Sequence, residues 1–251
     1  GSWANFENED FKLVSINTTR FDVTKHRATP VISDAKIGFE ELSKALGDWR
    51  APNIWFERAV KERTKWDSYV DKESGPTNRE LPTYAHAVGA IYRNADPSDI
   101  VVTAAGGLVG EVVQVWKPKQ INTFETEWGF SCMGYEISGA LGIKMAKPDQ
   151  DVIVFIGDGS YLLANSDIYS SVIYDKKLII VVCDNGGHMV INRLQLAKGG
   201  KEYICNLRAA RATNLQFVDF EMHAKSMGAN GETVTSTSEL EAAFLRAKKS
   251  D

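Results

Sequence analysis

Residues Asp151 to Asn192 read DVIVFIGDGSYLLANSDIYSSVIYDKKLIIVVCDNGGHMVIN. Two short apolar runs in this stretch predict strands, Val152 to Ile156 and Leu178 to Cys183, and the first is typical of a strand buried on both faces of a parallel sheet. A glycine-rich turn with an acid follows the first run, and a turn with an amide follows the second. In a right-handed β-α-β unit both turns lie at the carboxyl edge of the sheet, where open α/β folds bind ligands.

The first turn has the residues of a phosphate-binding turn. Gly157 and Gly159 allow the backbone to approach a ligand closely and to adopt unusual dihedral angles. The amides of Gly159 and Ser160 are expected to open a helix N-terminus, which is a favourable place for phosphate oxygens. The turn therefore predicts an anion site at the end of the first strand.

The two turns together predict a metal site. Asp158 offers a carboxylate oxygen, Asn185 an amide oxygen and Gly187 a backbone carbonyl. Hard oxygen ligands of this kind suit Mg²⁺, with phosphate oxygens and water completing the coordination.

This pattern resembles the motif of thiamine-diphosphate enzymes, in which GDG is followed, after a helix and a strand, by an Asn-rich turn. The resemblance implies that Asp158, Asn185 and the Gly187 carbonyl hold magnesium, which holds the diphosphate of the cofactor. The usual Asn-Asn of the family is Asp184-Asn185 here, so the ligand position is retained. The alternative is a doubly wound domain in which Gly-Asp-Gly forms only a tight turn.

Length and composition indicate an ordinary globular chain. It has 251 residues, with 43% hydrophobic and 25% charged residues, enough for one large or two ordinary domains. A formal net charge of −4 gives no basic surface for nucleic acid. No apolar run approaches the ~20 residues of a membrane helix and no signal peptide opens the chain. Together with only 3 cysteines, these features lead us to expect a cytoplasmic protein without a membrane partner.

We expect an α/β fold with a doubly wound parallel sheet, preceded by part of a second small α/β domain. The predicted organisation is a partial central α/β domain over residues 1–50, a helical linker over 51–80 and the diphosphate-binding domain over 81–251, truncated at its C-terminus. In the first part, strands are predicted at Phe11 to Ile16 and Pro30 to Ser33, and a helix at Asp34 to Leu46. In the linker, Pro52 to Val70 is predicted to be a helix that packs through the positions Trp55, Ala59, Trp66 and Val70.

In the third part, the chain alternates strands and helices. Further strands are predicted at Ile100 to Ala104, at Gln120 to Phe124 and around Thr233. Helices are predicted at Val109 to Trp116, Cys132 to Ala146, Asp219 to Met227 and Ser238 to Lys249.

The family resemblance extends to two further turns. Gly106-Gly107, after a predicted strand, stands where the family contacts the diphosphate; the alternative is an ordinary glycine turn. Met133-Gly134 resembles the turn that supports the aminopyrimidine ring. Met133 would be the apolar wedge that bends the cofactor, and the alternative is core packing.

A narrower resemblance is to the members of the family that hydrolyse a C–C bond of a cyclic 1,2-dione in inositol catabolism. It is carried by the segments TEWGFSCMGYEISGALGIKMA, VIVFIGDGSYLLANSDI and DNGGHMVINRLQLAKGG. It implies a small-molecule cyclic dione as the substrate and a deoxy-glucuronate as the product. His188 could carry a proton near the substrate, because its usual pKa lies near neutrality; a surface or packed histidine is the alternative. Two other functions remain open: an acetolactate-synthase-like carboligase or decarboxylase, and a non-catalytic ligand-binding module.

The resemblance also implies a partner. In this family a glutamate on a pyrimidine-binding domain of another subunit helps to activate the cofactor, and the letters of this chain supply no such domain. Glu125, Glu127 and Glu136 stand in the diphosphate-binding part and are not candidates for that role by the family pattern. We therefore expect the chain to hold half of an active site, in a protein that is a homo-oligomer at full length.

Overall fold

The structure is a computed structural model that describes residues 8, 10–212 and 214–250. The chain divides into two compact units, Gly1–Arg63 and Thr64–Asp251, and the division falls within one helix, α3 (Asn53–Glu73).

The smaller unit holds a two-stranded parallel sheet and one long helix. Its elements are β1 (Val14–Asn17), α1 (Arg20–Val23), η1 (Lys25–Arg27), β2 (Thr29–Ile32) and α2 (Ala35–Leu46). The side chain of Asp34 caps α2 by accepting hydrogen bonds from the Lys36 and Ile37 amides, and Gly47 ends it with a φ of 54°. The predicted helix is confirmed, and both predicted strands form within one to three residues of the expected bounds.

The helix α3 carries exposed hydrophobic side chains. Of its predicted packing positions Val70 is buried, whereas Trp55 and Trp66 are exposed and Ala59 is exposed as well. The helix also continues beyond the predicted Val70 to Glu73. The packing prediction for this helix was therefore wrong except at its C-terminal end, where α3 joins the core of the larger unit.

The larger unit is built on a four-stranded parallel sheet with strand order β4-β3-β5-β6. Its strands are β3 (Ile100–Thr103), β4 (Phe124–Thr126), β5 (Val152–Gly157) and β6 (Ile179–Cys183).

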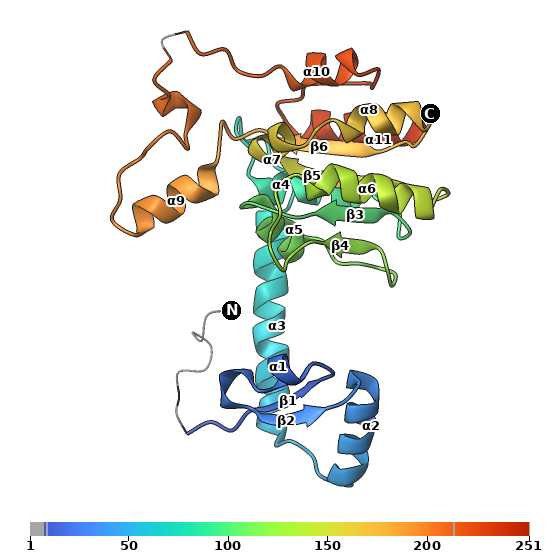
Figure 1. Cartoon of the computed structure of the whole chain (residues 1–251), viewed down its shortest axis with the longest axis vertical. Coiled ribbons are helices and arrows are strands. Elements are labelled where there is room, and N and C mark those ends of the chain that lie inside the picture. The colour runs from blue at the N-terminus through green and yellow to red at the C-terminus, as the bar shows by residue number, and fades with distance from the viewer. Residues whose placement is uncertain (1–7, 9, 213, 251) are drawn as a thin grey trace. The chain divides into compact units, whose positions relative to one another are not determined.

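Helices cover both faces of this sheet. Those that pack on one face are α4 (Tyr84–Asn94), α5 (Leu108–Val115) and α11 (Thr237–Lys249). Helices that pack on the other are α6 (Tyr135–Ala146), α7 (Asp158–Leu163), α8 (Asp167–Ile173) and α10 (Phe220–Ser226). Figure 1 shows these layers, and they confirm the doubly wound α/β fold. Two further elements are α9 (Met189–Ala197) and η2 (Leu207–Ala209).

The two central strands, β3 and β5, are buried on both faces, which confirms the prediction for Val152 to Ile156, whereas the edge strand β6 is mostly half-buried. In β3, Val101 belongs to the core under α4, α5 and α11, while its neighbour Val102 belongs to the core under α6 and α8. In β5, Phe155 and Val154 divide in the same way, and all four side chains are fully buried. Alternate side chains on opposite faces are a direct result of the two-residue repeat of a strand.

The strand order reverses between β3 and β5. The chain leaves β3 toward β4 on one side and then returns to place β5 on the other side of β3. Such a reversal separates the loops that follow the two strands and opens a crevice at their carboxyl ends. The predicted turns at 106–107 and 157–160 follow these two strands.

The strand predicted around Thr233 was wrong, since the structure describes no strand between α10 and α11. The backbone amide of Thr233 donates to the Glu221 carboxylate, and the amide of Thr235 donates to the Glu239 carboxylate. These donors are bonded by side chains, so this segment needs no neighbouring strand although its residues favour one.

Two predicted bounds moved for local reasons. The strand predicted at Gln120 to Phe124 forms instead as β4, because Asn122 has a φ of 63° and residues 121–122 form a turn. The helix predicted from Cys132 begins at Tyr135, because Gly134 before it has a left-handed φ of 95°. A single residue with positive φ interrupts either element.

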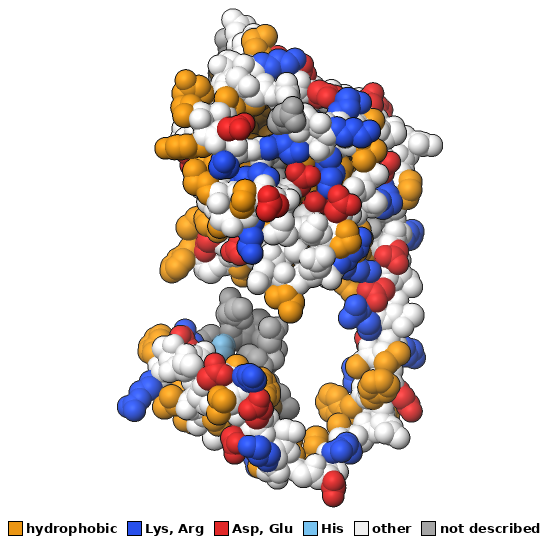
Figure 2. All heavy atoms as spheres, turned by 90° about the vertical axis from the view of Figure 1, so that its right-hand side faces the viewer, with side chains coloured by type: hydrophobic (Ala, Val, Ile, Leu, Met, Phe, Trp, Pro, Cys, Tyr) orange, Lys and Arg blue, Asp and Glu red, His pale blue; other side chains and the backbone are white. Residues whose placement is uncertain are grey.

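The surface of the larger unit is mixed in charge. Figure 2 presents one face of it, on which Lys and Arg side chains are interspersed with Asp and Glu. Among the described residues no helix has the length and apolar character that would let it cross a membrane.

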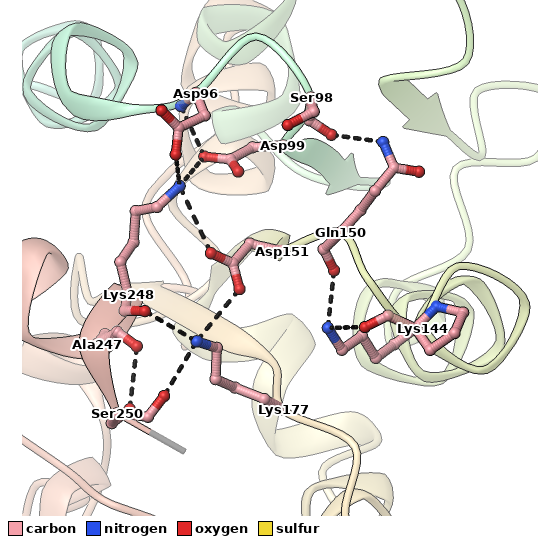
Figure 3. Close-up of polar contacts among 11 residues, drawn as sticks. Asp96, Ser98, Asp99, Lys144, Gln150, Asp151, Lys177, Ala247, Lys248 and Ser250 are labelled. Atoms are coloured by element: carbon pink, nitrogen blue, oxygen red, sulfur yellow. Dashed lines mark hydrogen bonds and ion pairs between the residues drawn. The ribbon is translucent and has the colours of Figure 1, made fainter.

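Charged side chains hold the amino edge of the sheet together (Figure 3). Lys248 on α11 donates to Asp96 at 2.7 Å and to Asp99 at 2.6 Å, and lies 3.5 Å from Asp151. Lys177 lies 3.2 Å from Asp151 and donates to the carbonyls of Lys248 and Ser250. We call these residues the Lys248 cluster: Asp96, Asp99, Asp151, Lys177, Lys248 and Ser250. It joins the C-terminal helix to the segments that begin β3, β5 and β6.

We expect Lys248→Met to lower the free energy of unfolding by about 3 kcal/mol, because the Asp99 carboxylate, 3% exposed, would lose its cation. Burial alone lowers the pKa of Lys248, but its hydrogen bonds to Asp96 and Asp99 outweigh burial and raise the pKa above its usual value. A raised folded pKa stabilises the fold below the unfolded pKa of ~10.4, and the contribution is lost as the pH rises through the folded pKa. Urea titrations at pH 7 and above pH 10.4 would measure both effects.

The neighbouring substitution Lys249→Met is the matched control, because Lys249 is exposed on the same helix turn. It should change stability by no more than about 0.5 kcal/mol. Equal losses in the two variants would show that the Lys248 cluster contributes nothing specific.

Candidate cofactor site

Four turns meet at the carboxyl edge of the sheet. They follow β3 at residues 104–107, β4 at 127–134 and β6 at 184–188, and the fourth, at 157–160, is formed by the end of β5 and the first turn of α7, so the predicted glycine-rich turn is helical from Asp158. Each of these turns contains residues that the sequence predicts to bind the cofactor.

Asp158 and Gly187 join the turns after β5 and β6. The Gly187 amide donates to the Asp158 carboxylate at 2.6 Å. Asp158 is 3% exposed, and this burial, with the nearby Asp184 charge, raises the pKa of its carboxyl, while the hydrogen bond from Gly187 lowers it. The two turns that the sequence separated by a helix and a strand are therefore in direct contact.

Tyr84, at the start of α4, orients the third predicted ligand. The side-chain amide of Asn185 donates its N–H to the Tyr84 hydroxyl. Burial raises the pKa of Tyr84 to about 12, so the phenol is neutral at pH 7. With the nitrogen of Asn185 engaged in this way, its Oδ1 oxygen remains available as an acceptor or a ligand.

Gly187 has room for no side chain. Its φ is 134°, and a Cβ atom there would lie 2.3 Å from the Cys205 carbonyl oxygen. The segment around η2 packs on this turn, because Gly187 bridges Asn206 and the Leu207 amide donates to the Gly186 carbonyl at 2.9 Å. The turn after β6 is thus fixed from outside by residues 205–207.

His188 lies over the glycine-rich turn. A Cβ atom on Gly159 would lie 2.6 Å from Nδ1 of the His188 ring. The ring is exposed and stands against the amides that were predicted to receive phosphate oxygens. Its predicted role beside the substrate stays a prediction.

The turn after β3 has the open backbone of a ligand-binding turn. Gly106 has a φ of 81° with open space around it, and Gly107 precedes α5. A Cβ atom on Gly107 would lie 3.0 Å from the Arg193 guanidinium on α9. A cationic side chain therefore lies beside the predicted diphosphate turn.

Met133 and Gly134 stand at the end of the turn after β4. Met133 is 38% exposed, so it is not a core residue. Gly134 has a φ of 95°, and a Cβ atom there would lie 2.6 Å from the Ala164 Cβ, so this position requires glycine.

Ser160 and Glu136 connect three of the turns. The Ser160 hydroxyl donates to the Glu136 carboxylate at 2.8–2.9 Å and accepts from the Gly134 amide at 2.8 Å. Glu136 also accepts from the amides of Gly134 at 2.9 Å and Ala105 at 3.2 Å. The Ser160 side chain thus points into the protein, and only its backbone amide can serve the predicted phosphate site.

Comparison with known families identifies this arrangement. Residues 104–251 match the model of the thiamine pyrophosphate enzyme C-terminal TPP binding domain, which is more than half of the chain. The chain belongs to the thiamine pyrophosphate enzymes. The matched region begins directly after β3 and contains all four turns.

Curated relatives extend over nearly the whole chain. The 3D-(3,5/4)-trihydroxycyclohexane-1,2-dione hydrolase of Halalkalibacterium halodurans is 34% identical over 98% of this chain and 42% of its own length. The enzyme of that name from Lacticaseibacillus casei is 33% identical over 95% of this chain and 40% of its own length. The chain thus spans about two-fifths of these relatives, and the narrower resemblance seen in the sequence agrees with them.

Solved thiamine-diphosphate enzymes share the fold. A 4-hydroxybenzoylformate decarboxylase from Rhodococcus jostii superposes with a TM-score of 0.60 at 18% identity, over 69% of this chain and 32% of that one. A benzoylformate decarboxylase from Polynucleobacter necessarius gives a TM-score of 0.58 at 21% identity, over 70% and 32%. At these identities the likeness concerns the fold alone.

The residues present fit the cofactor of this family. Within the described ranges, no group of three or more His, Cys, Asp and Glu side chains could hold a metal ion. The candidate magnesium site is of a different kind, with one carboxylate, one amide oxygen and one carbonyl. The Asp158 carboxylate accepts from the Gly187 amide, so the two segments that carry these oxygen atoms are in contact, and the nitrogen of the Asn185 amide is bonded to Tyr84, which leaves its Oδ1 open. Such a set suits Mg²⁺ completed by diphosphate oxygens.

Sequence reasoning did not assign Tyr84, Glu136 or Arg193 to the site. Tyr84 gives no local signal, because it lies far from Asn185 along the chain. Glu136 does give a local signal. It and Lys144 are the two charged residues of α6, a mostly apolar helix, and both are buried. A charge inside such a helix is informative, since charged residues are rarely buried without partners.

We expect Tyr84→Phe to weaken Mg²⁺-dependent binding of thiamine diphosphate by about 10- to 100-fold, the usual effect of losing a partner that orients a metal ligand. The hydroxyl that holds the Asn185 amide would be absent, while the ring would still fill its space. Calorimetric titration would measure this, with Tyr92→Phe on the same helix as a control. Affinities equal to wild type in Tyr84→Phe would exclude an orienting role.

Proposed function

We propose that the whole protein containing this chain is a thiamine-diphosphate- and magnesium-dependent hydrolase that cleaves a C–C bond of a cyclic 1,2-dione. In this proposal, trihydroxycyclohexane-1,2-dione is converted to 5-deoxy-glucuronate. The observation that carries the proposal is the contact between the two turns of the family motif, through Asp158 and Gly187. The named activity of relatives at 34% and 33% identity supports the choice of substrate class.

In this proposal, different residues of the chain bind the metal ion, the diphosphate and the pyrimidine end of the cofactor. Asp158, Asn185 and the Gly187 carbonyl would hold Mg²⁺. Backbone amides would receive the diphosphate oxygens, and an apolar side chain would support the bent shape of the cofactor. The residues proposed for these two tasks are Gly106, Gly107, Gly157, Gly159 and Ser160 for the diphosphate, and Met133 and Gly134 for the pyrimidine end. Thiamine diphosphate supplies a nucleophilic carbon and an electron sink for C–C cleavage when it is bound.

His188 would move a proton near the reacting atoms or donate a hydrogen bond to the cofactor. It is exposed at the carboxyl edge and its ring lies against Gly159. Met133 is exposed at the same edge. We propose that a pyrimidine-binding domain of another subunit covers this edge in a homo-oligomer, excludes water there and supplies the acid that activates the cofactor.

The test is product analysis of the whole protein with thiamine diphosphate and Mg²⁺. One reaction receives trihydroxycyclohexane-1,2-dione and the other receives pyruvate. Formation of the deoxy-glucuronate only in the first supports the hydrolase. Carbon dioxide and a condensed hydroxy-acid from pyruvate would instead identify a carboligase or decarboxylase.

A titration with thiamine diphosphate and Mg²⁺ tests the cofactor part separately. Binding that requires the metal supports an enzyme of this family. A protein that binds neither would be a non-catalytic ligand-binding module, the remaining alternative.

A further inference from the structure

Glu136 is a fully buried acid in the first turn of α6. Its exposed fraction is 0%, although it stands between apolar residues in a helix that packs on the sheet. A buried carboxylate is strongly unfavourable unless it is well hydrogen-bonded. Its retention therefore requires specific partners at both oxygens.

Those partners come from three turns of the candidate site. Oε1 accepts from the Ala105 amide after β3 and from the Ser160 hydroxyl after β5. Oε2 accepts from the Gly134 amide after β4 and again from the Ser160 hydroxyl. In the described part of the chain, every hydrogen bond that the carboxylate accepts comes from a neutral donor. Each donor is within three residues of a position proposed to contact the cofactor.

We propose that Glu136 is a positioning residue, which sets the distance between the diphosphate turns and the pyrimidine turn through Ala105, Gly134 and Ser160. This proposal rests on the proposed function. Ala105 fixes the start of Gly106-Gly107, and Ser160 belongs to the glycine-rich turn. Gly134 fixes the direction in which Met133 leaves the backbone.

Only a side chain that accepts hydrogen bonds at both terminal atoms, as the Glu136 carboxylate does, satisfies this geometry. Glutamine has the same shape but presents one oxygen and one NH₂ group. Whichever way that amide turns, a backbone N–H meets another donor, and one turn must move. Displacements of this kind, ~1 Å, can reduce a rate about a hundredfold without any change in the reacting groups.

Lys144 is a matched control in the same helix. It is 8% exposed and donates to the carbonyls of Pro148 and Gln150 at 2.8 Å, at the end of α6 away from the site. Lys144→Met removes a buried charge with its hydrogen bonds, as Glu136→Gln does, but touches none of the four turns. A purely structural role for Glu136 predicts the same result for the two variants.

The experiment compares Glu136→Gln, Ser160→Ala and Lys144→Met in the whole protein. Affinity for thiamine diphosphate with Mg²⁺, KM and kcat are measured well below the melting temperatures. Glu136→Gln should weaken cofactor affinity about tenfold and reduce kcat about a hundredfold. Ser160→Ala keeps the Glu136 carboxylate and removes the hydroxyl that bonds to it. It should also weaken cofactor affinity and reduce kcat. Lys144→Met should lower the melting temperature and leave affinity and kcat within about twofold of wild type.

Outcomes separate this inference from the proposed function. Wild-type protein that does not bind thiamine diphosphate overturns both. If the wild-type protein binds thiamine diphosphate but Glu136→Gln changes cofactor affinity and kcat no more than Lys144→Met does, the inference is overturned and the proposed function stands. If Glu136→Gln does not fold, Ser160→Ala decides: unchanged affinity and kcat in that variant reject a positioning role.

Discussion

Substitution of Asp158 by alanine is expected to abolish Mg²⁺-dependent binding of thiamine diphosphate. Asp158 is the carboxylate among the three proposed metal ligands, and its hydrogen bond from the Gly187 amide also holds the turn after β6 in place. Loss of a residue that only orients a ligand costs about 10- to 100-fold in metal affinity, and loss of the charged ligand itself should exceed that. Calorimetry at several Mg²⁺ concentrations is the direct measurement.

Two further variants show which property of Asp158 matters. Asp158→Asn keeps an acceptor for the Gly187 amide but removes the charge, and we expect it to fail as well. Asp184→Ala removes the acid that begins the turn after β6, which is exposed and accepts from the Gly186 amide. That variant should still bind the cofactor. Wild-type affinity in Asp158→Ala would mean that the magnesium site lies elsewhere.

Substitution of Gly187 by alanine is expected to be nearly as severe. The Cβ atom would lie 2.3 Å from the Cys205 carbonyl oxygen and 3.3 Å from the Leu207 nitrogen, both backbone atoms, at a φ of 134°. Strained backbone at such a position costs about 1–3 kcal/mol before the overlap is counted. Either the turn or the segment at 205–207 must move, so we expect loss of cofactor binding together with a lower melting temperature.

The adjacent Gly186→Ala is the control for backbone strain alone. Gly186 also has a positive φ, of 76°, but a Cβ atom there meets open space. A left-handed alanine costs about 1–2 kcal/mol, and the site should keep its cofactor affinity. Similar binding in the two variants would contradict the importance that we give to the contact between Gly187 and Cys205.

The core of the fold could be predicted from local sequence because its strands are apolar and short. Val152 to Ile156 are fully buried and Leu178 to Cys183 contain the mostly half-buried edge strand β6 beside them, and this parallel pairing puts Asp158 and Asn185 at the same edge. The prediction around Thr233 failed because β-branched residues state a preference, whereas the acids Glu221 and Glu239 bind the amides that a strand would use. Glu221 is twelve residues from Thr233, too far for a local pattern to include it, whereas Glu239 is four residues from Thr235 and belongs to the capping box that begins α11.

The candidate site divides in the same way. Glycines and hard oxygen ligands are recognisable from residue type and spacing, so Asp158, Asn185 and Gly187 are predictable as a group from the sequence. Tyr84 is not, since its link to Asn185 arises only when α4 packs against the sheet. The partners of Glu136 are not predictable in this way, because they are two backbone amides and one hydroxyl that come together only in the folded chain.

The Lys248 cluster and the candidate site occupy opposite edges of the sheet. Changes to the turns at the carboxyl edge therefore leave intact the contacts that hold the start of each strand. Positions 184 and 188 would be the ones to diversify in a directed-evolution library for other diketones, with Asn185, Gly186 and Gly187 kept. Most members of such a library should unfold at temperatures close to that of the parent. Selection could then act on substrate specificity rather than on solubility. In this way one fold can catalyse several reactions.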